Sequence, residues 1–176
     1  MDALSAEQIR ASFVNCSKGE AGRLALPRDL AEQPWEELDF LGWRDPGAPD
    51  RRYLVAPYRG AGDAGERLVG VTLRAPTNVR RTITRTNICA ICATAHGGDG
   101  VALLVARRAG DRGRDGNTVG TYLCTDLACS LYLRGRKQVK FGRQINEDLP
   151  VEARIERARD QLAAFLDQVL ATAPAA

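Results

Sequence analysis

The sequence predicts an α+β fold in which a mainly antiparallel sheet is flanked by helices. Three short segments rich in branched and aromatic residues, 38–43, 53–58 and 68–73, are separated by the turn-forming sequences DPGAPD and GAGDAG. This spacing is typical of an antiparallel meander. Two further strands are expected at 101–106 and 118–123, joined by the loop GDRGRDGN, which we interpret as a hairpin turn.

An N-terminal helix is predicted over residues 5–17. The sequence Ser-Ala-Glu-Gln at 5–8 matches a capping box, in which the first and last side chains satisfy the free backbone groups of a helix start. The apolar residues that follow fall on one helical face: Ile9, Phe13 and Cys16. Because free cysteines are commonly buried, Cys16 is expected in the core.

A C-terminal helix is predicted over about 149–172. Asp148 and Pro150 suit its start, and one apolar stripe follows it at helical spacing: Ile155, Ala158, Leu162, Phe165, Leu166 and Val169. A length of 176 residues corresponds to about one domain. We therefore expect residues 1–176 to form a single domain, with the sheet and a cysteine-containing module at about 37–143 between the two helices.

The composition is that of a globular protein, with 44% hydrophobic and 27% charged residues. The N-terminus lacks the basic and apolar regions of a secretory signal, and no segment approaches the ~18 consecutive apolar residues of a membrane span. A cytoplasmic protein without a membrane partner is therefore expected. In a reducing compartment, its five cysteines are better explained by metal binding or free thiols than by disulfides.

The charges are distributed unevenly along the chain. Residues 71–143 contain 13 Lys and Arg against 4 Asp and Glu, a balance of +9, whereas the remainder contains 12 against 18, a balance of −6. A positive field of this kind attracts acidic partners, and charge alone does not choose between nucleic acid and protein.

Four of the cysteines have the spacing of a zinc site. Cys89 and Cys92 are separated by two residues, and after 31 residues Cys124 and Cys129 are separated by four. A Cys-x2-Cys turn supplies two corners of a tetrahedron. Cys124 closes a predicted strand, and Cys129 falls in the first turn of a helix that Thr125 is expected to cap. Knuckle, hairpin and helix start follow one another as in a treble clef, so the sequence predicts a treble-clef-like four-cysteine module holding one structural zinc ion.

Four thiolates leave no coordination position for water or substrate, which favours a structural metal. His96, four residues after Cys92, is therefore expected to be a polar loop residue rather than a ligand. With one histidine and no G-x-S-x-G motif, a catalytic nucleophile has no support, and neither an enzyme nor a small-molecule substrate is predicted. The acidic run at 36–39 is interpreted as a solvated turn rather than as paired catalytic carboxylates.

The candidate partner-binding residues follow the predicted zinc-site helix. Basic side chains interleaved with aromatic ones suit phosphate contacts and base stacking, or an acidic protein surface with aromatic anchors. These residues are therefore consistent both with a zinc finger that binds a protein and with one that binds RNA. The candidates are Tyr132, Arg134, Arg136, Lys137, Lys140, Phe141 and Arg143.

The pattern ICAIC…GTYLCTDLACSLYLRG, with the upstream sequences SFVNCSKGEA and LDFLGWRDP, is similar to a known family. It resembles the C-terminal treble-clef zinc-finger domain of the elongation factor G-binding proteins, which include the FusB-type fusidic acid resistance proteins. The similarity covers most of residues 5–143. It implies that the zinc ligands are Cys89, Cys92, Cys124 and Cys129.

The resemblance also implies a function without catalysis. Proteins of this family bind elongation factor G and help it to leave the ribosome, which relieves the block when fusidic acid traps the factor there. The basic zinc-finger face would then meet the acidic factor. FusB-type proteins carry a separate N-terminal helical bundle, whereas this sequence leaves room for little more than one helix before the strands. The alternative is a ribosome-associated zinc finger that binds RNA directly.

Overall fold

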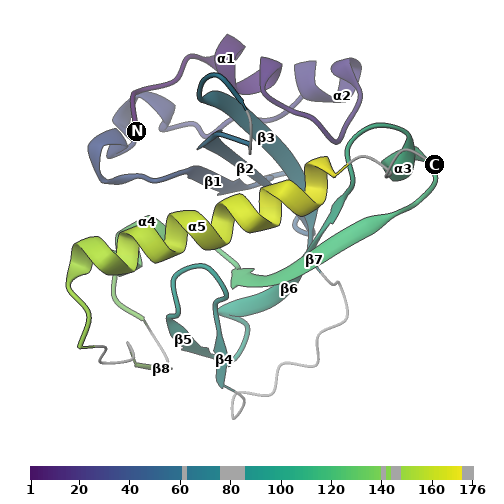
Figure 1. The fold of residues 1–176 in the computed structure, drawn as a ribbon. Coiled ribbons are helices and arrows are strands. Elements are labelled where there is room, and N and C mark those ends of the chain that lie inside the picture. Colours follow the sequence, from purple (N-terminus) through teal and green to yellow (C-terminus); the bar gives the residue numbers. More distant parts are fainter. Residues whose placement is uncertain (61–62, 76–85, 140–141, 144–147, 172–176) are drawn as a thin grey trace.

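The computed structural model describes residues 1–60, 63–75, 86–139, 142–143 and 148–171. A five-stranded antiparallel sheet has the strand order β1-β2-β3-β6-β7, and a smaller antiparallel sheet has the order β4-β5-β8 (Figure 1). The predicted α+β fold is confirmed. The strands are β1 Leu41–Arg44, β2 Arg51–Tyr58, β3 Arg67–Arg74, β4 Thr86–Ile88, β5 Ala95–Gly97, β6 Val101–Arg107, β7 Thr118–Cys124 and β8 Gly142–Arg143.

Short helices surround the sheet, and one long helix crosses it. In chain order the elements are α1 Ala6–Ala11, α2 Lys18–Gly22, the 3-10 turns η1 Leu30–Glu32 and η2 Trp35–Glu37, α3 Gly110–Arg114, α4 Cys129–Leu133 and α5 Val151–Leu170. Among the residues that the structure describes, no helix is both long enough and apolar enough to cross a membrane.

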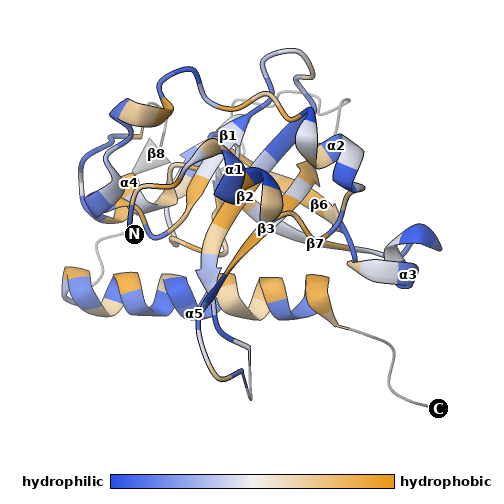
Figure 2. Ribbon diagram, turned by 90° about the horizontal axis from the view of Figure 1, so that it is seen from above, coloured by the Kyte–Doolittle hydropathy of each residue, from blue (hydrophilic) through white to orange (hydrophobic). Residues whose placement is uncertain are grey.

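Different parts of the chain pack against the two sides of the large sheet at β2. Along β2, Leu54 and Ala56 face a core that includes α5, whereas Tyr53 and Val55 face a second core that includes α1. Successive strand residues point to opposite faces, so this alternation follows from the pleat. Figure 2 shows α5 with bands of hydrophobic and hydrophilic residues, as expected for a helix that buries one side. We call the two sides of the sheet the α5 face and the N-terminal face.

The C-terminal helix agrees closely with its prediction, since α5 spans Val151–Leu170. Ile155 is partly buried, and the rest of the predicted stripe is buried: Ala158, Leu162, Phe165, Leu166 and Val169. The connection between β6 and β7 is not a simple hairpin turn, because it contains the short helix α3. Cys16, expected in the core, is only partly buried.

The N-terminal helix is shorter than the predicted 5–17. The capping box at its start is present, but α1 ends at Ala11. The chain then runs beside β3, where the Gly70 N–H donates to the Ser12 carbonyl at 2.9 Å and the Val14 N–H donates to the Gly70 carbonyl at 3.0 Å. A second capping box, at Ser17, starts α2. Pairing with a distant strand therefore replaces the helical hydrogen bonds that the apolar spacing had indicated.

The side chain of Asn15 fills the place where β3 and β6 diverge. Its Nδ2 donates to the carbonyls of Thr72 and Arg107, both at 3.0 Å, and its Oδ1 accepts the Thr72 N–H at 2.8 Å. A buried amide that bonds to both strands satisfies backbone groups that would otherwise lack partners. The N-terminal segment thus ends its path across the sheet at the edge of β6.

Candidate metal centre

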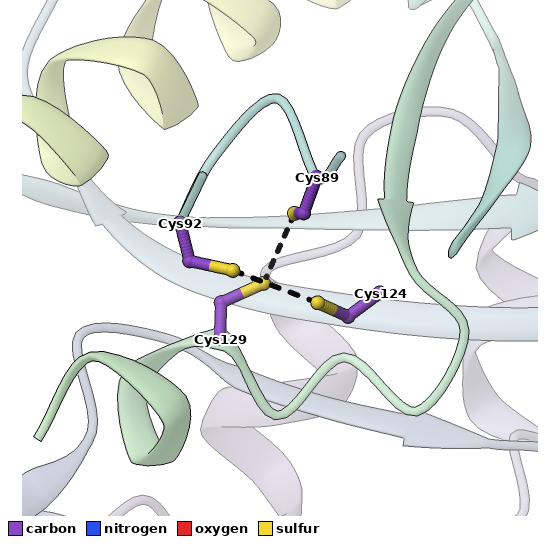
Figure 3. Close-up of side chains that lie close together, drawn as sticks. All are labelled: Cys89, Cys92, Cys124 and Cys129. Atoms are coloured by element: carbon purple, nitrogen blue, oxygen red, sulfur yellow. Dashed lines mark hydrogen bonds between the residues drawn. The ribbon is translucent and has the colours of Figure 1, made fainter. Parts of the chain in front are cut away.

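Four cysteine side chains from two parts of the chain converge on one point (Figure 3). The Sγ atoms of Cys89 and Cys129 lie 3.7 Å apart, those of Cys92 and Cys124 lie 3.6 Å apart, and all four lie within 4.8 Å of one another. All four residues are buried. Zinc–sulfur bonds of about 2.3 Å in a tetrahedron would place the sulfurs roughly 3.8 Å apart, so this group fits a zinc ion.

The first pair is delivered by a tight turn between β4 and β5. The Ala93 N–H donates to the Cys89 carbonyl at 2.9 Å, and the Cys89 N–H donates to the Thr94 carbonyl at 3.0 Å. Ala93 adopts φ 55°, which is uncommon for a residue other than glycine and reverses the chain after Cys92. The Ala90 N–H donates to the carbonyl of Tyr122 at 2.8 Å, which fixes the turn to β7.

The second pair spans the end of β7 and the start of α4. Cys124 is the last residue of β7 and Cys129 the first of α4. The predicted cap at Thr125 is wrong, because the helix begins later and Asp126 instead accepts the Ala128 N–H at 3.1 Å. Leu127, with φ 54°, lets the chain turn between Cys124 and Cys129.

That turn lies directly over β1. A Cβ built on Gly42 would lie 2.4 Å from the Cβ of Leu127. Real Cβ atoms do not approach so closely, so the turn can sit on the sheet only because residue 42 has no side chain. This contact places Cys124 and Cys129 against the α5 face of the sheet.

Close packing of the thiols acts in opposite directions on Cys89 and Cys129. Hydrogen bonds from Cys124, Cys129 and Cys92 lower the pKa of Cys89. Hydrogen bonds with Cys124, Cys89 and Cys92, followed by burial, raise the pKa of Cys129. The thiolate is therefore favoured at Cys89 and disfavoured at Cys129, and a bound divalent cation would compensate the charge of further thiolates.

His96 is a buried neighbour of the cysteines and not the polar loop residue that the sequence predicted. It lies on β5, its Nε2 is 3.4 Å from the Cys124 Sγ, and its ring packs edge-on against Tyr132 at a centroid distance of 4.8 Å. Burial lowers the pKa of His96, which favours the neutral ring. With its proton on Nε2, this ring would donate to the sulfur and hold it in place, as residues outside the ligand shell do in metal sites.

Asp39 joins three parts of the chain beside the metal centre. Arg134 donates to both carboxylate oxygens, at 2.6 and 3.1 Å, and Arg159 of α5 donates to Oδ1 at 2.9 Å. Only 4% of the Asp39 side chain is exposed. The interpretation of residues 36–39 as a solvated turn is therefore wrong at Asp39, although its neighbour Glu37 forms a more exposed pair with Arg136.

Arg52 is a buried contact to the metal centre that the sequence did not indicate. Its Nε donates to the carbonyl of Thr125 at 2.8 Å, between the two cysteines of the second pair. Its Nη1 donates to the carbonyls of Pro49 and Arg51. The one available signal was an arginine directly before the apolar run 53–58, which also fits an ordinary strand start.

The candidate partner-binding residues divide into an inward and an outward group. Tyr132 is buried and its hydroxyl donates to Asp126 at 2.8 Å, and Arg134 is held by Asp39. The side chains of Arg136 and Lys137 are 65% and 44% exposed and pair with Glu37 and Asp126. Lys140 and Phe141 lie outside the described residues, and only the backbone of Arg143, in β8, is described.

In a comparison with protein families, residues 8–169 match a model described as FBP C-terminal treble-clef zinc-finger. Searches of curated proteins and of solved structures returned no significant match. The match and the buried four-cysteine group together identify one structural zinc ion as the cofactor. The treble-clef order that the cysteine spacing predicted is thereby confirmed.

Proposed function

Because the chain belongs to the FBP C-terminal treble-clef zinc-finger family, we propose that it binds translation elongation factor G and promotes release of the factor from the ribosome. The observation that carries this proposal is the family match over 8–169, which includes all four cysteines. In cells exposed to fusidic acid, the same activity would give resistance to the drug.

The zinc ion supports this function as a cross-link and not as a reaction centre. Cys89, Cys92, Cys124 and Cys129 would hold it, and four sulfurs complete a tetrahedral shell, which is typical of structural sites. The ion would fasten the β4–β5 turn to the end of β7 and the start of α4. The proposed role is therefore binding without catalysis.

Release would follow from differential binding. A partner that binds the released conformation of the factor more tightly than the ribosome-bound one shifts the population towards release. The exposed basic side chains Arg136 and Lys137 would add to the long-range attraction for an acidic partner, although each already has an acidic neighbour within the chain. The proposed location is the cytoplasm, where translation takes place.

Titration calorimetry of the zinc-loaded protein against purified elongation factor G tests this proposal, with ribosomal RNA fragments run in parallel. Saturable binding to the factor, followed by faster release of the factor from ribosomes stalled with fusidic acid, is the expected result. Binding only to RNA, with an affinity that falls steeply as salt is raised, would replace the proposal with the RNA-binding alternative.

A further inference from the structure

The sheet exposes an apolar strip on the N-terminal face of β6 and β7. Along β6, Leu104 and Ala106 point to the α5 face and are buried, so Leu103 and Val105 point the other way. Leu103 lies directly opposite Tyr122 of β7. These two side chains are 40% and 50% exposed. We call the residues on this side of the two strands the hairpin face: Leu103, Val105, Arg107, Thr118, Gly120 and Tyr122.

The same side of the sheet is covered elsewhere. Over β1 and β2, the N-terminal face carries Trp43 and Tyr53, which are buried beneath the segment that contains α1. That segment pairs with β3 at Gly70 and ends its contact with the sheet where Asn15 bonds to Thr72 and Arg107. Within the described residues, the covering layer therefore stops at β3, and Leu103 and Tyr122 remain exposed beyond it.

Arginines border this strip. One row across β2, β3 and β6 consists of Arg51, Arg74 and Val105. The two arginines therefore lie directly opposite each other, and such a pair of like charges is unfavourable in an isolated sheet. Asp50 pairs with Arg74 at 2.7 Å. Arg107 lies on the hairpin face itself. The positive charge of these arginines beside the hairpin face therefore complements an acidic surface.

The backbone of the hairpin face is tied to the metal centre. The carbonyl of Tyr122 accepts the Ala90 N–H of the Cys-x2-Cys turn at 2.8 Å, and Cys124 follows two residues later. An exposed side chain on an anchored backbone needs less ordering on binding than one on a free loop, which suits Tyr122 as an interface anchor.

We propose that the hairpin face docks an acidic protein partner, with Tyr122 and Leu103 as its central anchors and Arg74 and Arg107 at its rim. Aromatic and arginine side chains dominate the energetics of protein interfaces, and an aliphatic anchor such as Leu103 packs against another protein rather than stacking on bases. This inference rests on the proposed function, whose partner is elongation factor G, and it places the contact on β6 and β7 instead of on residues 132–143.

Binding of the zinc-loaded full chain to elongation factor G, measured by calorimetry, tests the assignment with Tyr122→Thr and Leu103→Thr. Threonine is β-branched and is favoured in strands, so the sheet is expected to persist. Each variant should weaken binding about tenfold or more. The matched control is Leu149→Thr, which removes a similarly exposed leucine, 46% accessible, outside the hairpin and should bind within about twofold of the unchanged protein.

Hydrogen exchange of the unchanged protein gives a second readout that needs no variant. On addition of the factor, amides of 101–107 and 118–124 should become protected, whereas protection confined to residues 129–139 would overturn the assignment. Unchanged binding by both threonine variants would overturn it and leave the proposed function standing. Absence of any binding by the unchanged protein, or binding to RNA alone, would overturn both.

Discussion

The guanidinium of Arg134 donates two hydrogen bonds to the carboxylate of Asp39, which lies 95 residues earlier in the chain. The N–H of Asp39 donates to the Ser130 Oγ at 3.0 Å, so this residue contacts α4 through both its backbone and its side chain. Arg159 adds a contact from α5. One aspartate thus connects the segment before β1 to the zinc module and to the C-terminal helix.

Asp39→Asn is expected to destabilise the zinc-loaded protein by about 3 kcal/mol, because it leaves the largely buried Arg134 without a counter-charge. Urea unfolding measures this loss. The control is Asp50→Asn, which removes a more exposed ion pair with Arg74 and should cost no more than about 1 kcal/mol. Equal losses in the two variants would show that the Asp39–Arg134 pair has no special role.

The Asp39 contribution should disappear in acid. Burial by itself would raise the pKa of Asp39, but the hydrogen bonds and charges of Arg134 and Arg159 lower it below the ordinary value. Because the pKa of Asp39 is lower in the folded protein than in the unfolded one, the ion pair stabilises the fold at every pH above the unfolded-state pKa of about 3.9. This stabilisation is lost as the pH falls through the folded-state pKa. The difference in unfolding free energy between the unchanged protein and Asp39→Asn should therefore be constant near neutral pH and shrink below about pH 4. A difference that grows in acid would contradict this assignment.

Cys124→Ser should lose both the metal and the soluble protein, because binding of a structural zinc ion is coupled to folding. Elemental analysis of the purified protein should find one zinc per chain before the change and none after it. Cys16→Ser, which alters the cysteine outside the cluster, should keep the full zinc content. A folded, metal-free Cys124→Ser protein would refute a structural role for the ion.

His96→Phe should weaken zinc binding by roughly 10- to 100-fold, the usual effect of removing a residue that hydrogen-bonds a metal ligand. Phenylalanine preserves a ring against Tyr132 but cannot donate to the Cys124 sulfur. Competition with a chromophoric chelator measures the affinity. His96→Gln, which restores a donor, should recover part of the loss, and no recovery would indicate that packing alone explains the effect.

Gly42→Ala should destabilise the protein by roughly 1–3 kcal/mol, because the new Cβ would overlap Leu127 and displace the turn between Cys124 and Cys129. Thermal unfolding compares it with Gly22→Ala, at the end of α2, where an added Cβ meets nothing within 4 Å. Comparable melting temperatures for the two variants would argue against close packing of this turn on β1.

Features that depend on local pattern could be predicted from the sequence alone. Runs of branched and aromatic residues between turn sequences located strands of the large sheet, the apolar stripe located α5, and the capping box placed the start of α1 correctly. The four cysteines were found by spacing, because a tetrahedral zinc site restricts how far apart along the chain its ligands can lie.

The environment of individual polar residues could not be predicted in this way, because it depends on how distant segments pack. Asp39 and His96 lie in sequences that read as a turn and a loop, and both are buried because segments distant in sequence pack over them. The end of α1 was likewise set by Gly70, a residue on β3 that pairs with the chain at Ser12 and Val14. Burial and strand pairing of this kind depend on contacts between distant segments. These contacts outweigh local helix propensities, which amount to a few tenths of a kcal/mol per residue.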